Sequence, residues 1–191
     1  DNTIELIKEF QASDSWLAPR IKIVSSSGGR GPACRSAFEG SKGELIMCLH
    51  ADCVLPPNFD SYIRKGLVTQ GVLGTCFRFA VNRHSFAGEP VAGLSVMEWT
   101  VFVRSGLLQL PFGDQALAMT RQKLCEAGGF SADPIMEDWQ LVQTMRRAGA
   151  AGGGFIQMLP VAVQCSGRRW EKMGVWRTNL VNQLTMLWFT Q

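Results

Sequence analysis

The chain has 191 residues, of which 46% are hydrophobic and 18% are charged, and its formal net charge is +3. This length and composition are typical of one globular domain with a substantial core, and they exclude a disordered chain. A net charge of +3 is too small to indicate nucleic-acid binding by itself. We therefore expect a single domain over residues 1–191 that does not bind nucleic acid.

The six cysteines are scattered along the chain, with no C-x-x-C pair and no other spacing typical of a zinc site. We interpret all six as reduced thiols and expect a cytoplasmic protein, with association to a membrane surface left open. The first residues carry no signal-peptide pattern.

The predicted elements alternate between helices and strands, as in an α/β domain. In chain order we expect a helix over 3–10, a strand over 21–25, a glycine-rich loop over 26–32, a helix over 33–41 that starts with Pro32, and a strand over 44–49. Then come a helix over 58–66, a strand over 72–81, helices over 94–105 and 121–127 around a strand over 115–120, a helix over 137–147, a loop over 148–154, one or two strands over 155–163 and a helix over 175–189. Residues 21–49 would form a right-handed βαβ unit. The last helix is too short and too polar to span a bilayer, but it can pack on the core or make a peripheral membrane contact.

The segment from Leu45 to Asp52 carries the most information. Five apolar residues end at His50 and an acid, and a short, wholly apolar strand is typical of a parallel sheet that is buried on both faces. An acid at the carboxyl end of such a strand lies where open α/β sheets bind ligands, and it can hold a divalent cation against a phosphate. Asp52 is equally well explained as a turn or helix-capping residue.

Four other segments contain residues that could bind a ligand or act in catalysis, and each also has a purely structural explanation. They are the Gly-Arg loop at 28–35, the turn at 111–115, the acids that open the helix at Glu137 and Asp138, and the basic-aromatic segment at 166–170. Acids are favoured at any helix N-terminus. Adjacent helical residues point about 100 degrees apart, so only one of the two acids can face a cleft while the other caps or supports.

Taken together, the order and spacing of these motifs resemble family 2 glycosyltransferases of the GT-A fold. The resemblance is strongest to the small branch of radical-SAM/selenodomain-associated transferases 2. It spans roughly residues 1–180 and is carried by Gly29-Arg30-Gly31-Pro32, Leu49-His50-Ala51-Asp52, Leu55-Pro56-Pro57, Leu110-Pro111-Phe112-Gly113-Asp114-Gln115, Gly128-Gly129-Phe130, Met136-Glu137-Asp138 and Arg168-Arg169-Trp170.

The resemblance implies a Rossmann-like, mostly parallel sheet flanked by helices, and an inverting transfer of sugar from a nucleotide-sugar donor to an unknown acceptor hydroxyl. Asp52 would bind Mg²⁺ or Mn²⁺ at the donor diphosphate, in a D-x-D-type element whose first acid is replaced by His50. Asp138 would be the catalytic base, with Glu137 beside it. The donor and acceptor would be contacted by Arg30, Gly31, Arg35, His50, Asp52, Gly113, Asp114, Gln115, Arg168, Arg169 and Trp170.

The same resemblance implies a departure at the beginning of the chain. Members of the family begin with two strands that form the nucleoside pocket and lie between the strands at 21–25 and 44–49, and this sequence has neither. We therefore expect an N-terminally truncated fragment that folds poorly or binds its donor weakly. The alternatives are a degenerate, non-catalytic module that binds a nucleotide sugar or a partner, and a nucleotidyltransferase, which leaves Glu137, Asp138 and the Arg168 motif unexplained.

Overall fold

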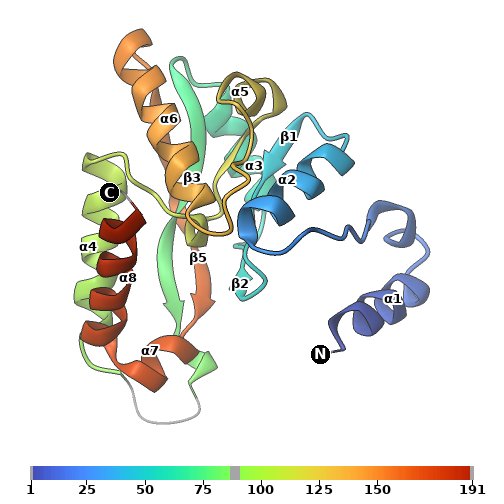
Figure 1. The fold of residues 1–191 in the computed structure, drawn as a ribbon, viewed down its shortest axis with the longest axis horizontal. Helices are drawn as coiled ribbons and strands as arrows, with labels where there is room; N and C mark the ends of the chain where they lie inside the picture. Colours follow the sequence, from blue (N-terminus) through green and yellow to red (C-terminus); the bar gives the residue numbers. More distant parts are fainter. Residues whose placement is uncertain (1, 87–90, 190–191) are drawn as a thin grey trace.

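A five-stranded mixed sheet forms the centre of the fold in the computed structural model, which describes residues 2–86 and 91–189 (Figure 1). Its strands are β1 (Leu45–Met47), β2 (Cys53–Val54), β3 (Val72–Asn82), β4 (Ala118–Thr120) and β5 (Phe155–Ser166), in the spatial order β1-β4-β3-β5-β2. Within the described residues only β3 and β5 run parallel, while the other three strand pairs are antiparallel. The α/β class is confirmed, and the mostly parallel character is confirmed only in part.

The helices are α1 (Thr3–Ser13), α2 (Arg30–Gly40), α3 (Phe59–Leu67), α4 (Leu94–Leu107), α5 (Arg121–Glu126), α6 (Glu137–Gly152), α7 (Arg168–Met173) and α8 (Val175–Phe189), with 3₁₀ turns η1 (Ala18–Arg20), η2 (Arg83–Ser85) and η3 (Gly113–Gln115). Every predicted helix is present. α2 starts at Arg30, so Pro32 lies within its first turn instead of opening it. The predicted loop over 148–154 is mostly helix, because α6 continues to Gly152 and the glycine that ends it is Gly153, with φ 74°.

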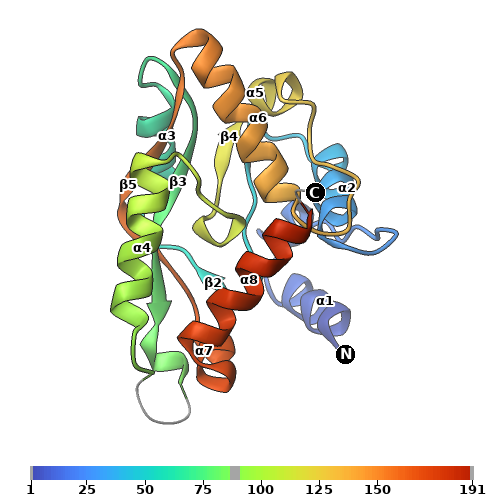
Figure 2. The ribbon, with the colours of Figure 1, turned by 60° about the vertical axis from the view of Figure 1, so that its left-hand side comes forward.

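The sheet separates two apolar cores, and β3 serves both because its side chains alternate in direction. Phe77, Phe79 and Val81 face one core with residues of α3 and α4, whereas Cys76 faces the other core below α5 and α6. Figure 2 shows α4 and α6 running along the sheet, and α7 and α8 following the end of β5. Pro160 is accommodated in β5 at a shift of register against β3, where no ladder hydrogen bond is required.

Two expectations about the first half of the chain are wrong. Residues 21–25 form no strand and join no sheet, so the βαβ unit over 21–49 does not form. β1 is not a buried parallel strand, because it lies at the end of the sheet, pairs antiparallel with β4 and is half-buried. Local β propensity cannot form a strand without a neighbour, and 21–25 has no such neighbour within the described residues.

The outer side of β1 is open, and helix α1 is set apart from the sheet. An apolar groove of about 480 Å³ lies between α2 and β1 and is lined by Ala37, Phe38, Ile46 and Phe130, among others. α1 has no buried residue, and Figure 1 shows it beyond the extended segment that leads to α2. Across the described residues, no helix is long and apolar enough to cross a membrane.

Candidate active site

The N-terminal ends of α2 and α6 meet through an ion-pair cluster that joins residues more than 100 positions apart in the sequence. Arg30 Nε lies 2.9 Å from Glu137 Oε1, and another guanidinium nitrogen of Arg30 lies 3.4 Å from Asp138 Oδ1. The side chain of Glu137 is 2% exposed, whereas that of Arg30 is 49% exposed. Met136, which precedes the two acids, has φ 65°, a backbone conformation that non-glycine residues adopt at a cost. The backbone is therefore strained at the residue that directly precedes these two carboxylates.

Asp138 is held in one orientation by two backbone N–H groups. Gly113 N donates to Asp138 Oδ2 at 2.7 Å, and Trp139 N donates to Asp138 Oδ1 at 2.8 Å. Gly113 also lies close to His50, because a Cβ added at position 113 would be 2.7 Å from His50 Nε2 and 3.0 Å from Asp138 Oδ2. A glycine is thus needed where His50, η3 and α6 converge.

Three buried polar atoms near this point have no hydrogen-bond partner in the described structure: His50 Nε2, Asp114 Oδ1 and Glu137 Oε2. Buried polar atoms are rarely left without a partner, and such atoms are common where a ligand, ion or water binds. Burial raises the pKa of Asp114, although the charges of Arg104 and His50 act in the opposite direction. The arrangement is therefore ready to receive a polar or charged ligand.

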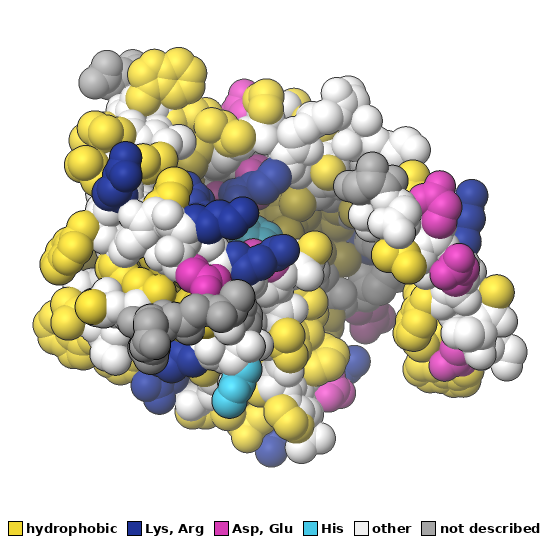
Figure 3. Space-filling view, turned by 90° about the horizontal axis from the view of Figure 1, so that it is seen from below, with side chains coloured by type: hydrophobic (Ala, Val, Ile, Leu, Met, Phe, Trp, Pro, Cys, Tyr) yellow, Lys and Arg dark blue, Asp and Glu magenta, His cyan; other side chains and the backbone are white. Residues whose placement is uncertain are grey.

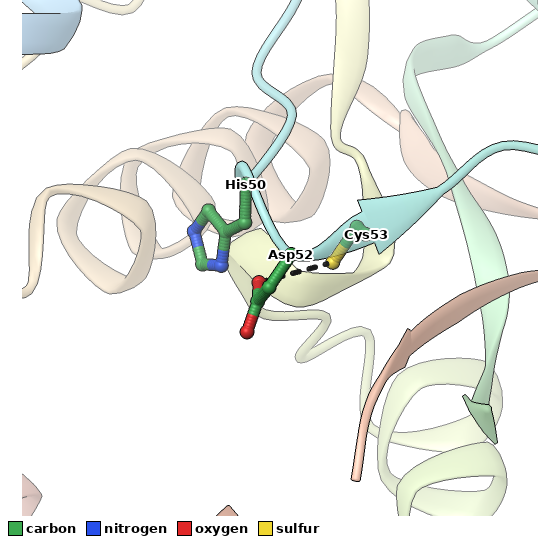
Figure 4. A group of neighbouring side chains, drawn as sticks. All are labelled: His50, Asp52 and Cys53. Atoms are coloured by element: carbon green, nitrogen blue, oxygen red, sulfur yellow. Dashed lines mark hydrogen bonds between the residues drawn. The ribbon is translucent and has the colours of Figure 1, made fainter. Parts of the chain in front are cut away.

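His50, Asp52 and Cys53 form a group that could hold a metal ion, with one ligand atom from each residue within 4.8 Å of the others. Figure 4 shows His50 and Asp52 on the turn that follows β1 and Cys53 at the start of β2, with the Cys53 thiol directed toward the Asp52 carboxylate. The thiol and the imidazole suit a borderline ion such as Zn²⁺, whereas Mg²⁺ and Mn²⁺ prefer oxygen ligands such as the Asp52 carboxylate. The predicted role of Asp52 in metal binding thus has neighbouring ligand groups to support it.

The predicted basic-aromatic motif begins beside Asp52. Ser166 N, at the end of β5, donates a hydrogen bond to Asp52 O at 2.9 Å, and α7 starts two residues later with Arg168. Arg168 and Arg169 are exposed, while Trp170 packs edge-on against Phe79 with ring centroids 5.8 Å apart. Figure 3 shows several basic side chains around a hollow on one face of the molecule, beside acidic and histidine side chains.

Three other predicted site residues make their contacts away from Glu137 and Asp138. Arg35 faces Glu39 one turn along α2, at 3.8 Å. Gly31 is buried where a Cβ would overlap the carbonyl oxygens of the 131–133 loop. Gln115 is fully buried, donates to Phe77 O at 2.8 Å and accepts from Ser105 Oγ at 2.7 Å.

Sequence reasoning missed the residues of α4 and β5 that complete this region. Ser105 and Arg104 lie behind η3, and the Arg104 guanidinium stacks over the Phe112 ring at 3.7 Å. Cys165 Sγ donates to Asp114 O at 3.1 Å and lies against Cys53. A helix that carries adjacent Arg and Ser residues shortly before the 111–115 turn was a usable signal. The position of Cys165 depends on strand pairing, so no local signal indicated it.

Comparison with known proteins supports the resemblance that the motifs carry. The family model described as glycosyl transferase family 2 matches residues 1–129 of the 191, a range that includes Arg30, His50, Asp52 and the 111–115 turn. No curated protein and no solved structure is found to match the chain.

Proposed function

The chain belongs to glycosyl transferase family 2, and on that basis we propose that it transfers a sugar from a nucleotide-sugar donor to an acceptor hydroxyl with inversion at the anomeric carbon. Within the family we assign it to the radical-SAM/selenodomain-associated transferase 2 branch. The observation that carries the proposal is the convergence of Asp138, Gly113 and His50 on one point of the fold.

Asp138 is the proposed base. Its side chain is 13% exposed, whereas that of Glu137 is 2% exposed, so Asp138 is the acid that an acceptor hydroxyl can reach. The two backbone N–H groups fix its carboxylate, which keeps one oxygen lone pair aimed at the proton to be removed. Glu137 is a positioning residue, because it holds Arg30 next to that carboxylate.

The donor diphosphate would lie between the Asp52 turn and the start of α7. Asp52, with His50 and Cys53, would hold a divalent ion that stabilises the negative charge of the leaving diphosphate. Arg168 and Arg169 supply exposed cations two and three residues after Ser166, which donates a hydrogen bond to Asp52 O. A carboxylate and cations beside each other suit a metal-bound diphosphate better than a neutral ligand.

Donor hydrolysis and transfer test the proposal. Wild-type protein is assayed with UDP- and GDP-sugars and Mn²⁺, next to Asp52→Ala and Asp138→Asn. We expect Asp138→Asn to lower turnover by roughly 10²–10⁴-fold while leaving nucleotide binding intact, and Asp52→Ala to abolish metal-dependent binding. Unchanged activity in both variants would refute the proposal. Metal-dependent nucleotide binding without turnover in the wild type would instead favour the non-catalytic binding module.

We also propose that the protein contacts a membrane surface through the exposed apolar side chains of α4 and α8. Exposed apolar side chains continue along two helices, Val96, Trp99, Phe102 and Leu107 on α4, and Trp176, Leu180, Leu184 and Trp188 on α8. Aromatic and aliphatic side chains on exposed helices are typical of contact with a lipid interface.

A further inference from the structure

Cys53 and Cys165 lie on neighbouring strands at the edge of the candidate site. They are direct partners in the antiparallel register of β2 and β5. Ser166 N donates to Asp52 O at 2.9 Å, while Cys53 N donates to His50 O, so the flanking pair is hydrogen-bonded and the cysteine pair is not. The two Sγ atoms are 2.7 Å apart, and both cysteines are free thiols.

The register satisfies the geometry of a disulfide. Partners at a non-hydrogen-bonded position of an antiparallel pair have Cα atoms about 4.5 Å apart, which lies inside the range of about 4.4–6.8 Å that disulfides span. Cys53 is partly exposed and Cys165 is buried, so a small oxidant has access to one member of the pair only. The partner thiol is already in contact when the first is oxidised.

We propose that Cys53 and Cys165 form a reversible disulfide that switches the metal-binding group off. With a peroxide as oxidant, the Cys53 thiol is converted to a sulfenic acid and one water leaves; the Cys165 thiol then displaces the hydroxyl, the S–S bond forms, and a second water leaves. Two electrons pass from the two sulfurs to the peroxide. A thiol reductant returns both cysteines to the free state.

Disulfide formation would change two contacts of the candidate site, because each thiol has a partner there in the reduced state. In the reduced state Cys53 Sγ belongs to the group with His50 and Asp52, and Cys165 Sγ donates to Asp114 O at 3.1 Å. The disulfide removes the thiol ligand from that group and the donor from Asp114. This consequence rests on the proposed metal role of Asp52, whereas formation of the disulfide does not.

Peptide mapping tests the disulfide without any activity assay. The protein is treated with hydrogen peroxide or with oxidised glutathione, alkylated and digested with trypsin. We expect peptide 43–64 linked to peptide 148–168, with the intact chain lighter by two hydrogen atoms and restored by dithiothreitol. Cys34 and Cys48 form a second close pair, with Sγ atoms 3.5 Å apart, and would link peptide 31–35 to peptide 43–64 instead. Finding only that second link, or free thiols at positions 53 and 165, would overturn the proposal.

Cobalt binding tests the consequence. Co²⁺ bound through a thiolate gives a charge-transfer absorption, which we expect in the reduced wild type and in Cys165→Ser, and which we expect to be lost in Cys53→Ser and in the oxidised wild type. Oxidation should weaken Co²⁺ binding by roughly tenfold or more in the wild type, a size that changes around metal sites commonly produce. Cys165→Ser should be insensitive to the oxidant, and Cys125→Ser, on the exposed face of α5, should respond as the wild type does. A cross-link that forms without changing Co²⁺ binding would refute the switch while leaving the disulfide and the transferase proposal standing.

Discussion

Replacing Gly113 by alanine tests the convergence at the centre of the site most directly. The new Cβ would lie 2.7 Å from His50 Nε2 and 3.0 Å from Asp138 Oδ2, whereas ordinary van der Waals contact begins at 3.4 Å. Either the imidazole or the carboxylate must retreat, and the hydrogen bond of 2.7 Å from Gly113 N to Asp138 lengthens. A hydrogen bond to a charged group contributes about 1.5–3 kcal/mol, which corresponds to roughly 10- to 100-fold in rate if the bond is needed to aim the base.

We therefore expect Gly113→Ala to lower kcat/KM by roughly 10- to 100-fold in donor turnover with Mn²⁺, with most of the change in kcat. Gly113 lies outside the positive-φ region, so alanine adds no backbone strain there, and the loss of stability should be confined to the crowding of His50 and Asp138, about 1–3 kcal/mol in urea unfolding. Gly152→Ala is the matched control, since a Cβ at position 152 meets no atom within 4 Å. Wild-type kinetics in Gly113→Ala would show that His50 and Asp138 do not act together at this point.

Three further predictions concern burial, charge and the outer helices. Glu137→Gln should lower turnover less than Asp138→Asn does, because the Glu137 side chain is 2% exposed and its charge is paired with Arg30; an equal loss of turnover in the two variants would contradict this. Burial raises the pKa of Asp114 in the folded state, so between the unfolded pKa of about 3.9 and the higher folded pKa the folded state binds more protons and stability falls as the pH rises. Asp114→Asn should therefore flatten the dependence of Tm on pH above about pH 3.9; curves of wild type and variant that run parallel would refute this. Trp188→Ala, which removes a 74% exposed ring, should weaken sedimentation with anionic lipid vesicles without changing Tm.

The sequence predicted helices better than strands, and the reason is physical. Helices such as α3 and α4 depend on hydrogen bonds and side-chain periods within one segment, so the pattern of residues 59–67 or 94–107 is sufficient. Strands depend on partners that are distant in the chain. Residues 21–25 have the composition of a strand but no neighbour to pair with, and β1 looks like a central strand although it pairs on one side only.

The site could be predicted in its parts but not in its assembly. The motifs around His50, Asp52, Gly113 and Asp138 indicated which residue types matter, and the fold does bring these four into one region. No local pattern indicated that Cys165 would lie against Cys53, because that contact is set by the register of β2 on β5.

Arg30 shows how the assembly changes the meaning of a single residue. The resemblance assigns Arg30 to the nucleotide or its phosphates, yet its Nε and one terminal nitrogen contact Glu137 and Asp138. A guanidinium has five N–H donors in a fixed plane, and a side chain that is 49% exposed keeps some of them available to an anion. Arg30 can therefore hold the proposed base, Asp138, in place and still offer donors to the proposed nucleotide-sugar ligand.

Arg30→Lys separates these two tasks, because lysine keeps the charge but loses the planar fork. We expect Arg30→Lys to raise KM for the donor modestly, since a cation remains, and to lower kcat by roughly tenfold or more, since one ammonium cannot bridge both carboxylates in the same geometry. Arg30→Gln should additionally destabilise the fold, because the buried Glu137 loses its cation, by about 1–3 kcal/mol in urea unfolding. If Arg30→Lys instead raised KM and left kcat unchanged, Arg30 would act on the donor alone and the orientation of Asp138 would depend on its two backbone N–H donors.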